Sequence, residues 1–284
     1  MSDDPRILVS TDWLDQRLKT RGLRILDGSW YLPAMARDGR AEYDGSHIPG
    51  AGFFDIDVVS DPGRDLPHMI PDAVHFEQAV SGLGISNSDQ VVVYDGTGLF
   101  SAARVWWLFR YMGHDQVAVL DGGLPKWRAE GRSLTDALPP VKSGLFSAAP
   151  QPDMLRSAAQ VLDAIKNGTE QITDARGAAR FRGEASEPRA GLRSGHMPGA
   201  YNLPFDAVLC DGGQMADAAA LTEILDKAGL DLARPIITSC GSGVTAAVLT
   251  LALTRLGHEN NALYDGSWAE WGGDASPPIA TGES

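Results

Sequence analysis

The stretch PIITSCGSGVTAAVLTLAL contains Cys240, one of two cysteines in the chain, between an apolar run and a helical pattern. The run predicts a strand over Pro235–Ser239 and a helix that begins near Val244. Ligands of α/β sheets bind outside the carboxyl ends of the strands, where Cys240 would lie. Loop amides and a helix N-terminus favour a thiolate, and Gly241 and Gly243 let the backbone curl around whatever the sulfur carries. These residues predict a nucleophilic cysteine.

The elements that position Cys240 recur in the first half of the sequence. ILDGS, SHIPGAGFFDID, VVVYDGTGLFSAARVWWLFRYMGH and VAVLDGGLPKW are followed, in the same order, by ITDAR, SGHMPGAYNLPFD, PIITSCGSGVTAAVLTLALTRLGH and NALYDGSWAEW. The chain is therefore a duplication, in which Asp95 takes the place of Cys240. His47 and His196 open the same turn in both halves, so we interpret both as fold elements.

The fold class follows from the order of the blocks. Short β-branched runs alternate with helical stretches in each half, which is typical of a parallel sheet covered on both faces. We predict an α/β protein of two tandem domains, over residues 20–137 and 160–276. A linker rich in Pro, Ser and Ala would join them over 138–159.

Three chemistries compete for the loop. GSGVTA fits the G-x-G-x-x-A pattern of dinucleotide binding, with Asp265 at the end of the next strand, but a carboxylate such as Asp95 at this place would repel a pyrophosphate. A cysteine phosphatase needs an arginine where Ala246 stands. Sulfur transfer needs a thiolate, a small loop and no bulky charge, and it fits best. Cys240 could also have a purely structural role, as a small buried hydrophobic residue. The repeat argues against this alternative, because the first half folds with Asp95 at the same place. Cys210, before DGG, is interpreted as incidental.

Composition excludes several classes of function. The net charge of −13 argues against binding nucleic acid or an anionic membrane. The six histidines are scattered and no CxxC pair occurs, so no zinc site is predicted, and we expect neither a metal nor an organic cofactor. The start MSDDPRILVS does not look like a secretory signal and no long apolar run is present, so we expect a cytoplasmic protein.

The duplicated halves, the H-x-P-G-A blocks, and CGSGVTA followed by YDGSWAEW resemble the two-domain rhodanese sulfurtransferases over about residues 7–271. Within that family, CGSGVT is similar to the 3-mercaptopyruvate sulfurtransferases, whereas members specific for thiosulfate carry basic residues in the loop. The resemblance implies transfer of sulfur from 3-mercaptopyruvate, through a persulfide on Cys240, to a thiol acceptor such as thioredoxin or glutathione, or to cyanide. A thiosulfate sulfurtransferase and a non-enzymatic persulfide carrier remain the alternatives.

The resemblance also implies the site residues. Arg180 and Arg189 match the substrate-binding pair, with Arg182 and Arg193 near enough in sequence to confuse the assignment. Ser242, His68 and Asp57 match a proposed relay that would donate a proton to the pyruvate enolate, although Ser242 also suits a helix cap. Domain one would be catalytically silent and would supply Asp57 and His68. The loop residues expected to contact substrate are Gly241, Gly243, Val244 and Thr245.

Overall fold

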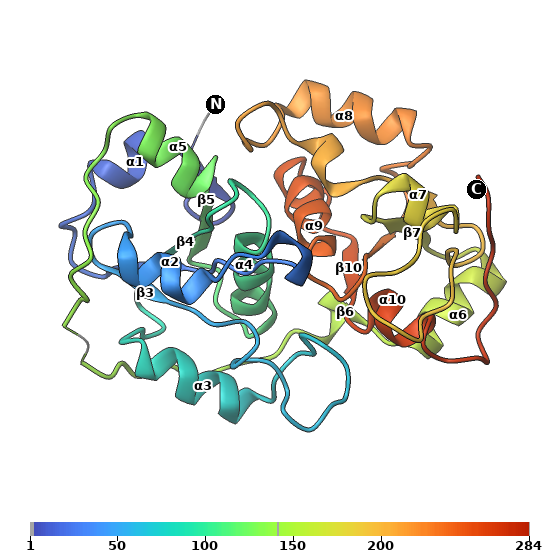
Figure 1. Cartoon of the computed structure of the whole chain (residues 1–284), viewed down its shortest axis with the longest axis horizontal. Helices are drawn as coiled ribbons and strands as arrows, with labels where there is room; N and C mark the ends of the chain where they lie inside the picture. Colours follow the sequence, from blue (N-terminus) through green and yellow to red (C-terminus); the bar gives the residue numbers. More distant parts are fainter. Residues whose placement is uncertain (1–2, 141, 284) are drawn as a thin grey trace. The chain divides into compact units, whose positions relative to one another are not determined.

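A computed structural model describes residues 3–140 and 142–283 of the 284-residue chain. These residues form two compact units (Figure 1). The first unit contains the chain up to Pro62 together with Ile70–Gln151 and Cys210–Met215, and the second contains Gly63–Met69, Pro152–Leu209 and the chain from Ala216 onward. Each unit therefore includes a short segment from the other half of the sequence.

Each unit contains a five-stranded parallel sheet, and the strand order is the same in both. The first sheet has the order β1-β5-β4-β2-β3 and the second the order β6-β10-β9-β7-β8. These sheets confirm the predicted fold class of two tandem α/β domains. The strands of the first unit are β1 (Leu8–Val9), β2 (Leu23–Asp27), β3 (Ala51–Phe53), β4 (Gln90–Tyr94) and β5 (Val117–Leu120). Those of the second are β6 (Leu155–Arg156), β7 (Gln171–Asp174), β8 (Tyr201–Asn202), β9 (Ile236–Ser239) and β10 (Asn261–Tyr264).

Helices connect the strands in the same places in both units (Figure 1). The helix after β4 and the helix after β9 are almost entirely buried, because the first packs on β4 and β5 and the second on β9 and β10. The first unit has α1 (Thr11–Asp15), η1 (Pro33–Met35), α2 (Gly39–Gly45), α3 (Ala73–Gly82), α4 (Ala102–Tyr111) and α5 (Gly123–Ala129). The second has η2 (Pro152–Met154), α6 (Ala158–Asn167), α7 (Ala178–Phe181), η3 (Phe205–Val208), α8 (Ala218–Lys227), α9 (Ala246–Arg255) and α10 (Ser267–Trp271).

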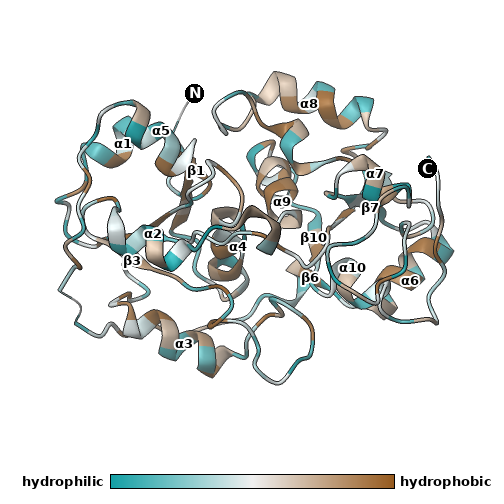
Figure 2. Ribbon diagram, in the orientation of Figure 1, coloured by the Kyte–Doolittle hydropathy of each residue, from teal (hydrophilic) through white to brown (hydrophobic). Residues whose placement is uncertain are grey.

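Side-chain caps explain where several of these helices begin. Asp72 accepts a hydrogen bond from the backbone of His75 at the start of α3, and Asp217 accepts one from Ala220 at the start of α8. Ser157 forms a capping box at the start of α6. Such caps satisfy amides that have no partner within the helix. Figure 2 shows both hydrophilic and hydrophobic residues on α8, as expected for a helix with one buried side.

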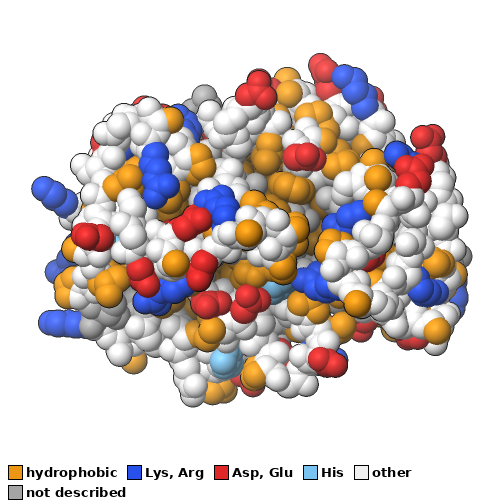
Figure 3. Space-filling view, in the orientation of Figure 1, with side chains coloured by type: hydrophobic (Ala, Val, Ile, Leu, Met, Phe, Trp, Pro, Cys, Tyr) orange, Lys and Arg blue, Asp and Glu red, His pale blue; other side chains and the backbone are white. Residues whose placement is uncertain are grey.

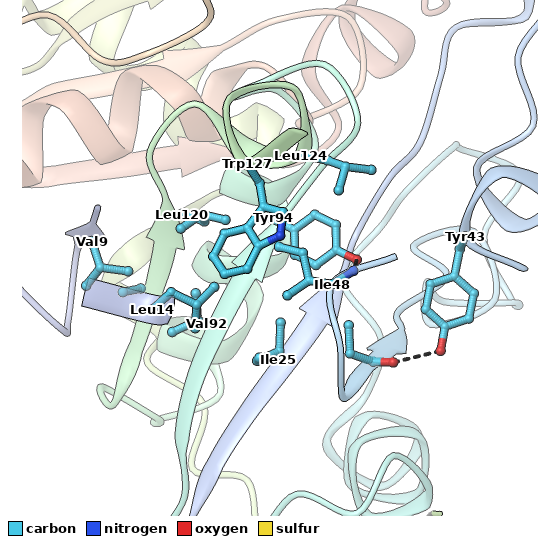
Figure 4. Close-up of a cluster of buried hydrophobic side chains, with 12 residues drawn as sticks. Val9, Leu14, Ile25, Tyr43, Ile48, Val92, Tyr94, Leu120, Leu124 and Trp127 are labelled. Atoms are coloured by element: carbon cyan, nitrogen blue, oxygen red, sulfur yellow. Dashed lines mark hydrogen bonds between the residues drawn. The ribbon is translucent and has the colours of Figure 1, made fainter. Parts of the chain in front are cut away.

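A cluster of buried side chains forms one face of the first unit's core (Figure 4). Tyr94 and Trp127 are fully buried within it, and the Tyr43 hydroxyl donates a hydrogen bond to the Ala51 carbonyl at 2.7 Å. The cluster consists of Val9, Leu14, Ile25, Tyr43, Ile48, Ala51, Val92, Tyr94, Ala118, Leu120, Leu124 and Trp127. The corresponding cluster of the second unit contains Trp268 and Trp271.

The repeated histidines have the same surroundings in both units. His47 Nδ1 lies 2.7 Å from the Tyr43 carbonyl, and His196 Nδ1 lies 2.8 Å from the Phe181 carbonyl. Each imidazole is buried and stacks on the ring of that same partner residue. Identical contacts in the halves with and without the cysteine support the interpretation of both histidines as fold elements.

The chain between the two sheets packs against the first unit over part of its length. The backbone of Gly144 donates to Ser81, and that of Ala149 donates to Met112. Phe146 is buried against Phe76 and Phe109. The predicted linker 138–159 thus includes residues with tertiary contacts, while β6 and the start of α6 within it belong to the second unit. The domain limits 20–137 and 160–276 remain a proposal.

Charged side chains of both signs are interspersed on the face drawn in Figure 3, and no single basic patch covers that face. Among the described residues, no helix is both long and apolar enough to cross a membrane.

Candidate active site

Cys240 directly follows β9, and α9 begins six residues later at Ala246, so the loop between them closely matches the prediction. Cys240 is 2% exposed. Its carbonyl accepts a hydrogen bond from Trp268, and the Gly241 carbonyl accepts one from Ala269, both at 2.9 Å. Gly243 has a φ of +78°, a conformation that glycine adopts without steric cost. The start of α10 therefore holds the loop in its curled form.

The amides of this loop fall into two groups. Those of Cys240 and Gly243 donate to Ser267 Oγ, at 3.2 and 3.1 Å. In the part of the chain that the structure describes, no acceptor is found for the amides of four other loop residues. These four are Gly241, Ser242, Val244 and Thr245. They are the donors that remain for a negatively charged sulfur.

In the equivalent loop of the first unit, the backbone amides donate hydrogen bonds to a carboxylate. The Asp95 carboxylate, at the place of Cys240, accepts backbone hydrogen bonds of 2.7–3.1 Å from four residues: Thr97, Gly98, Phe100 and Ala102. The Thr97 hydroxyl donates a further one, at 2.7 Å. An anion on this first side chain is thus surrounded by inward-pointing amides. We infer that the Cys240 loop, built on the same frame, is suited to a thiolate and to a persulfide.

Ser267 is a site residue that the sequence reasoning missed. It is fully buried at a φ of +49°, its hydroxyl donates to the Tyr264 carbonyl at 2.8 Å, and it accepts the two loop amides described above. The first unit has Gly123 here, at a φ of +52°, where a Cβ would lie 2.6 Å from the Asp95 carbonyl. The signal was present in the repeat, as a serine in YDGSW against a glycine in LDGGL.

The structure brings both predicted substrate arginines to the loop. A Cβ on Gly241 would lie 3.2 Å from Arg180 Nη2 and 3.9 Å from Arg189 Nη1. Arg189 Nη2 also donates to Ser242 Oγ, at 3.4 Å. Arginine forks of this kind suit a ligand that carries a carboxylate and a carbonyl.

The two neighbouring arginines that sequence alone left ambiguous make other contacts. Arg182 pairs with the exposed Glu184 at 2.8 Å. Arg193 donates to backbone carbonyls of Trp271 and Pro277. These contacts favour Arg180 and Arg189 as the substrate pair, and the assignment stays a prediction.

A buried ion network lies behind Arg180, and sequence reasoning did not identify it. The Arg176 side chain is 1% exposed and contacts Asp174 and Glu187, each at 2.7 Å. Burial acts to lower the pKa of Arg176, but the two carboxylates outweigh it and raise the pKa above its usual value. Arg176 is therefore held as a cation in the interior.

His68 and Ser242 of the proposed relay lie together. His68 Nδ1 is 3.0 Å from Ser242 Oγ, and His68 is 4% exposed with a φ of +61°. His68 comes from the segment Gly63–Met69, which groups with the second unit although it was expected as part of domain one. Asp57 belongs to the first unit, where it accepts a hydrogen bond from Trp30 Nε1 at 3.0 Å. Its role in the relay stays a proposal.

Within the described residues, no group of three or more His, Cys, Asp or Glu side chains could hold a metal ion. Cys210 is exposed and belongs to the first unit.

Comparisons with known proteins agree with this geometry. A model of the rhodanese-like domain matches residues 10–130 and 157–274, and the chain belongs to that family. It is 43% identical over 298 residues to thiosulfate/3-mercaptopyruvate sulfurtransferase 1, mitochondrial, of Arabidopsis thaliana, with 98% of this chain and 79% of that protein covered. It is 42% identical over 272 residues to 3-mercaptopyruvate sulfurtransferase of Escherichia coli K12, covering 95% of this chain and 96% of that one. Tum1 protein from Saccharomyces cerevisiae superposes with a TM-score of 0.91 at 30% identity, over 99% of this chain and 100% of that chain.

Proposed function

We propose that the protein is a 3-mercaptopyruvate sulfurtransferase. The Cys240 thiolate attacks the sulfur of 3-mercaptopyruvate, and the sulfur–carbon bond breaks as the sulfur–sulfur bond forms. The electron pair of the broken bond leaves on the pyruvate enolate, which takes up a proton. An acceptor thiolate or cyanide then attacks the outer sulfur of the persulfide and releases the Cys240 thiolate again. Atoms and charge balance without a redox partner.

The observation that carries the proposal is the pair Arg180 and Arg189 beside Gly241, next to the nucleophile. Two guanidinium groups suit the carboxylate and carbonyl of 3-mercaptopyruvate. The amides without protein acceptors suit the sulfur, which carries the negative charge after transfer. Two proteins of the same family, from Arabidopsis and Escherichia coli, carry 3-mercaptopyruvate in their names.

Ser242 and His68 serve the departing enolate in this proposal. The serine hydroxyl lies between the imidazole and Arg189, within hydrogen-bonding distance of both. A proton held on this pair relieves the charge that builds up as the carbon–sulfur bond breaks. Asp57 is the third proposed member of the relay. We assign the first repeat, with Asp95 at the cysteine position, no catalytic step of its own.

Thiosulfate is the alternative donor, and the name of the Arabidopsis relative includes it. The loop from Cys240 to Thr245 contains no lysine or arginine. It therefore has no cation of its own to stabilise the dianion thiosulfate, and it suits 3-mercaptopyruvate, which carries one carboxylate and a carbonyl, better. The test is the rate of pyruvate release from 3-mercaptopyruvate against the rate of sulfite release from thiosulfate, with cyanide as the common acceptor. We expect 3-mercaptopyruvate to have the larger kcat/KM. A larger value for thiosulfate would reverse the assignment.

A non-enzymatic persulfide carrier is the second alternative. Such a protein would accept sulfur but would release pyruvate only slowly in steady state, even when an acceptor is present. An enzyme continues, so sustained pyruvate release with glutathione, thioredoxin or cyanide decides between the two. We propose a thiol such as thioredoxin or glutathione as the acceptor, and the cytoplasm as the compartment.

A further inference from the structure

We propose that Glu187 is a positioning residue for substrate binding, which holds the Arg180 guanidinium in the orientation that meets the donor's carboxylate. This inference rests on the proposed function, because it takes Arg180 as a substrate contact.

The Glu187 carboxylate binds one edge of the Arg180 guanidinium group. Its side chain is 2% exposed, and its carboxylate accepts from Arg180 Nε at 3.3 Å and from Arg180 Nη2 at 2.5 Å. Two parallel contacts between a guanidinium edge and a carboxylate fix the plane of the guanidinium. Arg180 itself is 25% exposed, so the arginine can reach a ligand while the glutamate remains covered.

Glu187 is anchored in turn from the sheet. Its Oε1 accepts from Arg176 Nη1, and Arg176 also contacts Asp174 through Nε and Nη2. Arg176 further donates to a backbone carbonyl at 2.8 Å and stacks over the Trp268 ring at 4.1 Å. Asp174 is the last residue of β7 and pairs in register with Ser239, the residue before the nucleophile. The orientation of Arg180 is thus tied, through buried groups, to the strand that ends directly before Cys240.

The far end of Arg180 lies against the cysteine loop. Its Nη2 would be 3.2 Å from a Cβ on Gly241, so the absence of a side chain at this glycine lets the guanidinium approach the loop. Nη1 has no acceptor within the described part of the chain. Glu187 accepts hydrogen bonds from Nε and from one N–H of Nη2 of Arg180. The other N–H groups of the Arg180 guanidinium are therefore available to the carboxylate of the donor.

The first unit contains a matched pair that provides the control. Arg37 donates to Glu42 at 2.7 and 2.6 Å, and its Nη2 lies against Gly96, the residue after Asp95. The same kind of arginine–glutamate contact therefore flanks a loop that has no cysteine. Removing the charge of Glu42 perturbs a comparable contact away from the reaction.

The test uses the full chain with Glu187→Gln, Glu187→Asp and Glu42→Gln. For Glu187→Gln we expect KM for 3-mercaptopyruvate to rise about tenfold while kcat changes by less than about threefold, since a charge-assisted contact that orients a binding group is lost. Glu187→Asp keeps the charge and should restore part of the change. Glu42→Gln should leave both constants unchanged. If Glu187→Gln does not fold, Glu187→Asp still tests the inference, through an intermediate rise in KM.

A double variant separates positioning from general damage. In an Arg180→Ala background, Glu187→Gln should raise KM no further, because the residue it positions is absent. An unchanged KM in folded Glu187→Gln, or an equal additional rise without Arg180, would overturn the proposal. Failure of the proposed function looks different: the wild-type protein would then release no pyruvate from 3-mercaptopyruvate in sustained turnover.

Discussion

Two residues at equivalent places, Asp95 and Cys240, explain most of the site's chemistry. The duplicated frame surrounds the first with inward-pointing amides, and the second stands where a carboxylate is otherwise accommodated. A thiolate resembles that carboxylate in charge and adds nucleophilicity. In the proposed function, the arginines beside Gly241 give the loop a preference for a donor with a carboxylate.

Loss of Arg189 tests that preference. Arg189→Ala removes a guanidinium beside Ser242, and we expect KM for 3-mercaptopyruvate to rise about 10- to 100-fold, the effect of a lost charge-assisted hydrogen bond. Arg182→Ala is the matched control, because that arginine pairs with an exposed glutamate. Steady-state pyruvate release gives both values. A comparable rise in the Arg182 variant would mean that the wrong arginine was chosen.

The sequence indicated some residues of the candidate site and missed others for a physical reason. Cys240, Ser242 and the two arginines lie in motifs whose residue types carry chemistry by themselves. Glu187 and Arg176 pair with each other at a buried contact, and each has a further ionic partner, Arg180 and Asp174; no local pattern shows these contacts. Ser267 carries a weak signal that only the comparison of the two repeats reveals.

At the scale of elements, the loop between β9 and α9 is shaped by its contact with the start of α10. Ser267 holds the amides of Cys240 and Gly243 together, and it does so from a left-handed conformation that disfavours side chains. Such local strain persists when surrounding contacts impose it. The loop thus depends on a residue 27 positions beyond the cysteine.

Ser267→Gly should separate stability from activity. Glycine relieves the positive φ while the two accepted hydrogen bonds are lost, so the free energy of unfolding should stay within about 1 kcal/mol of wild type. Without the hydroxyl, the loop amides are no longer held, and we expect sulfur transfer to slow roughly tenfold. Thermal melting and the single-turnover rate of pyruvate release measure the two effects.

Gly123→Ala at the matching place should show the reverse pattern. Its Cβ would collide with the Asp95 and Gly98 carbonyls, so the protein should lose stability while the folded fraction keeps its rate of transfer. A full transfer rate in Ser267→Gly would contradict the role of the hydroxyl.

At the scale of the whole molecule, the two repeats differ in the groups that surround an equivalent buried aspartate. Asp27 ends β2 and Asp174 ends β7, and both are buried. Asp174 has Arg176 as its partner, whereas Asp27 accepts from the backbone of Ser29. Burial therefore raises the pKa of Asp27 to about 6, against hydrogen bonds from Ser29 and Tyr94 that act to lower it.

This difference predicts that replacing aspartate by asparagine changes the stability of the protein in opposite directions at the two positions. The raised pKa means that folding favours protonated Asp27, so its contribution to stability is present at low pH and is lost as pH rises through about 6. A shift from 3.8 to about 6 corresponds to at most about 3 kcal/mol. We expect Asp27→Asn to stabilise the protein at pH 7.5 relative to wild type, by less than that amount, and to lose the advantage near pH 4.

Asp174→Asn is the contrasting variant. It leaves the buried Arg176 with Glu187 alone, and the loss should be roughly 3–5 kcal/mol at neutral pH. Urea denaturation of both variants and wild type, at two or more pH values, checks the signs. Destabilisation by Asp27→Asn at pH 7.5 would show that the carboxylate is better solvated than its burial implies.

The fold could be predicted to this scale because each repeat alternates strand and helix patterns at nearly equal spacing. The exchange of segments could not be predicted. Gly63–Met69 and Cys210–Met215 follow equivalent strands, yet each groups with the unit of the other half, where His68 contacts Ser242 and Met215 donates to Asp121. Nothing in the local pattern of a connecting loop indicates such long-range contacts.

The most direct test of the account is the mass of the protein after exposure to 3-mercaptopyruvate without an acceptor. One added sulfur, about 32 Da, should appear and map to Cys240 by peptide analysis, as expected for a persulfide intermediate. Cys210→Ser should keep the adduct, and Cys240→Ser should lose it. An adduct that persists in Cys240→Ser, or pyruvate release by that variant, would contradict the central claim.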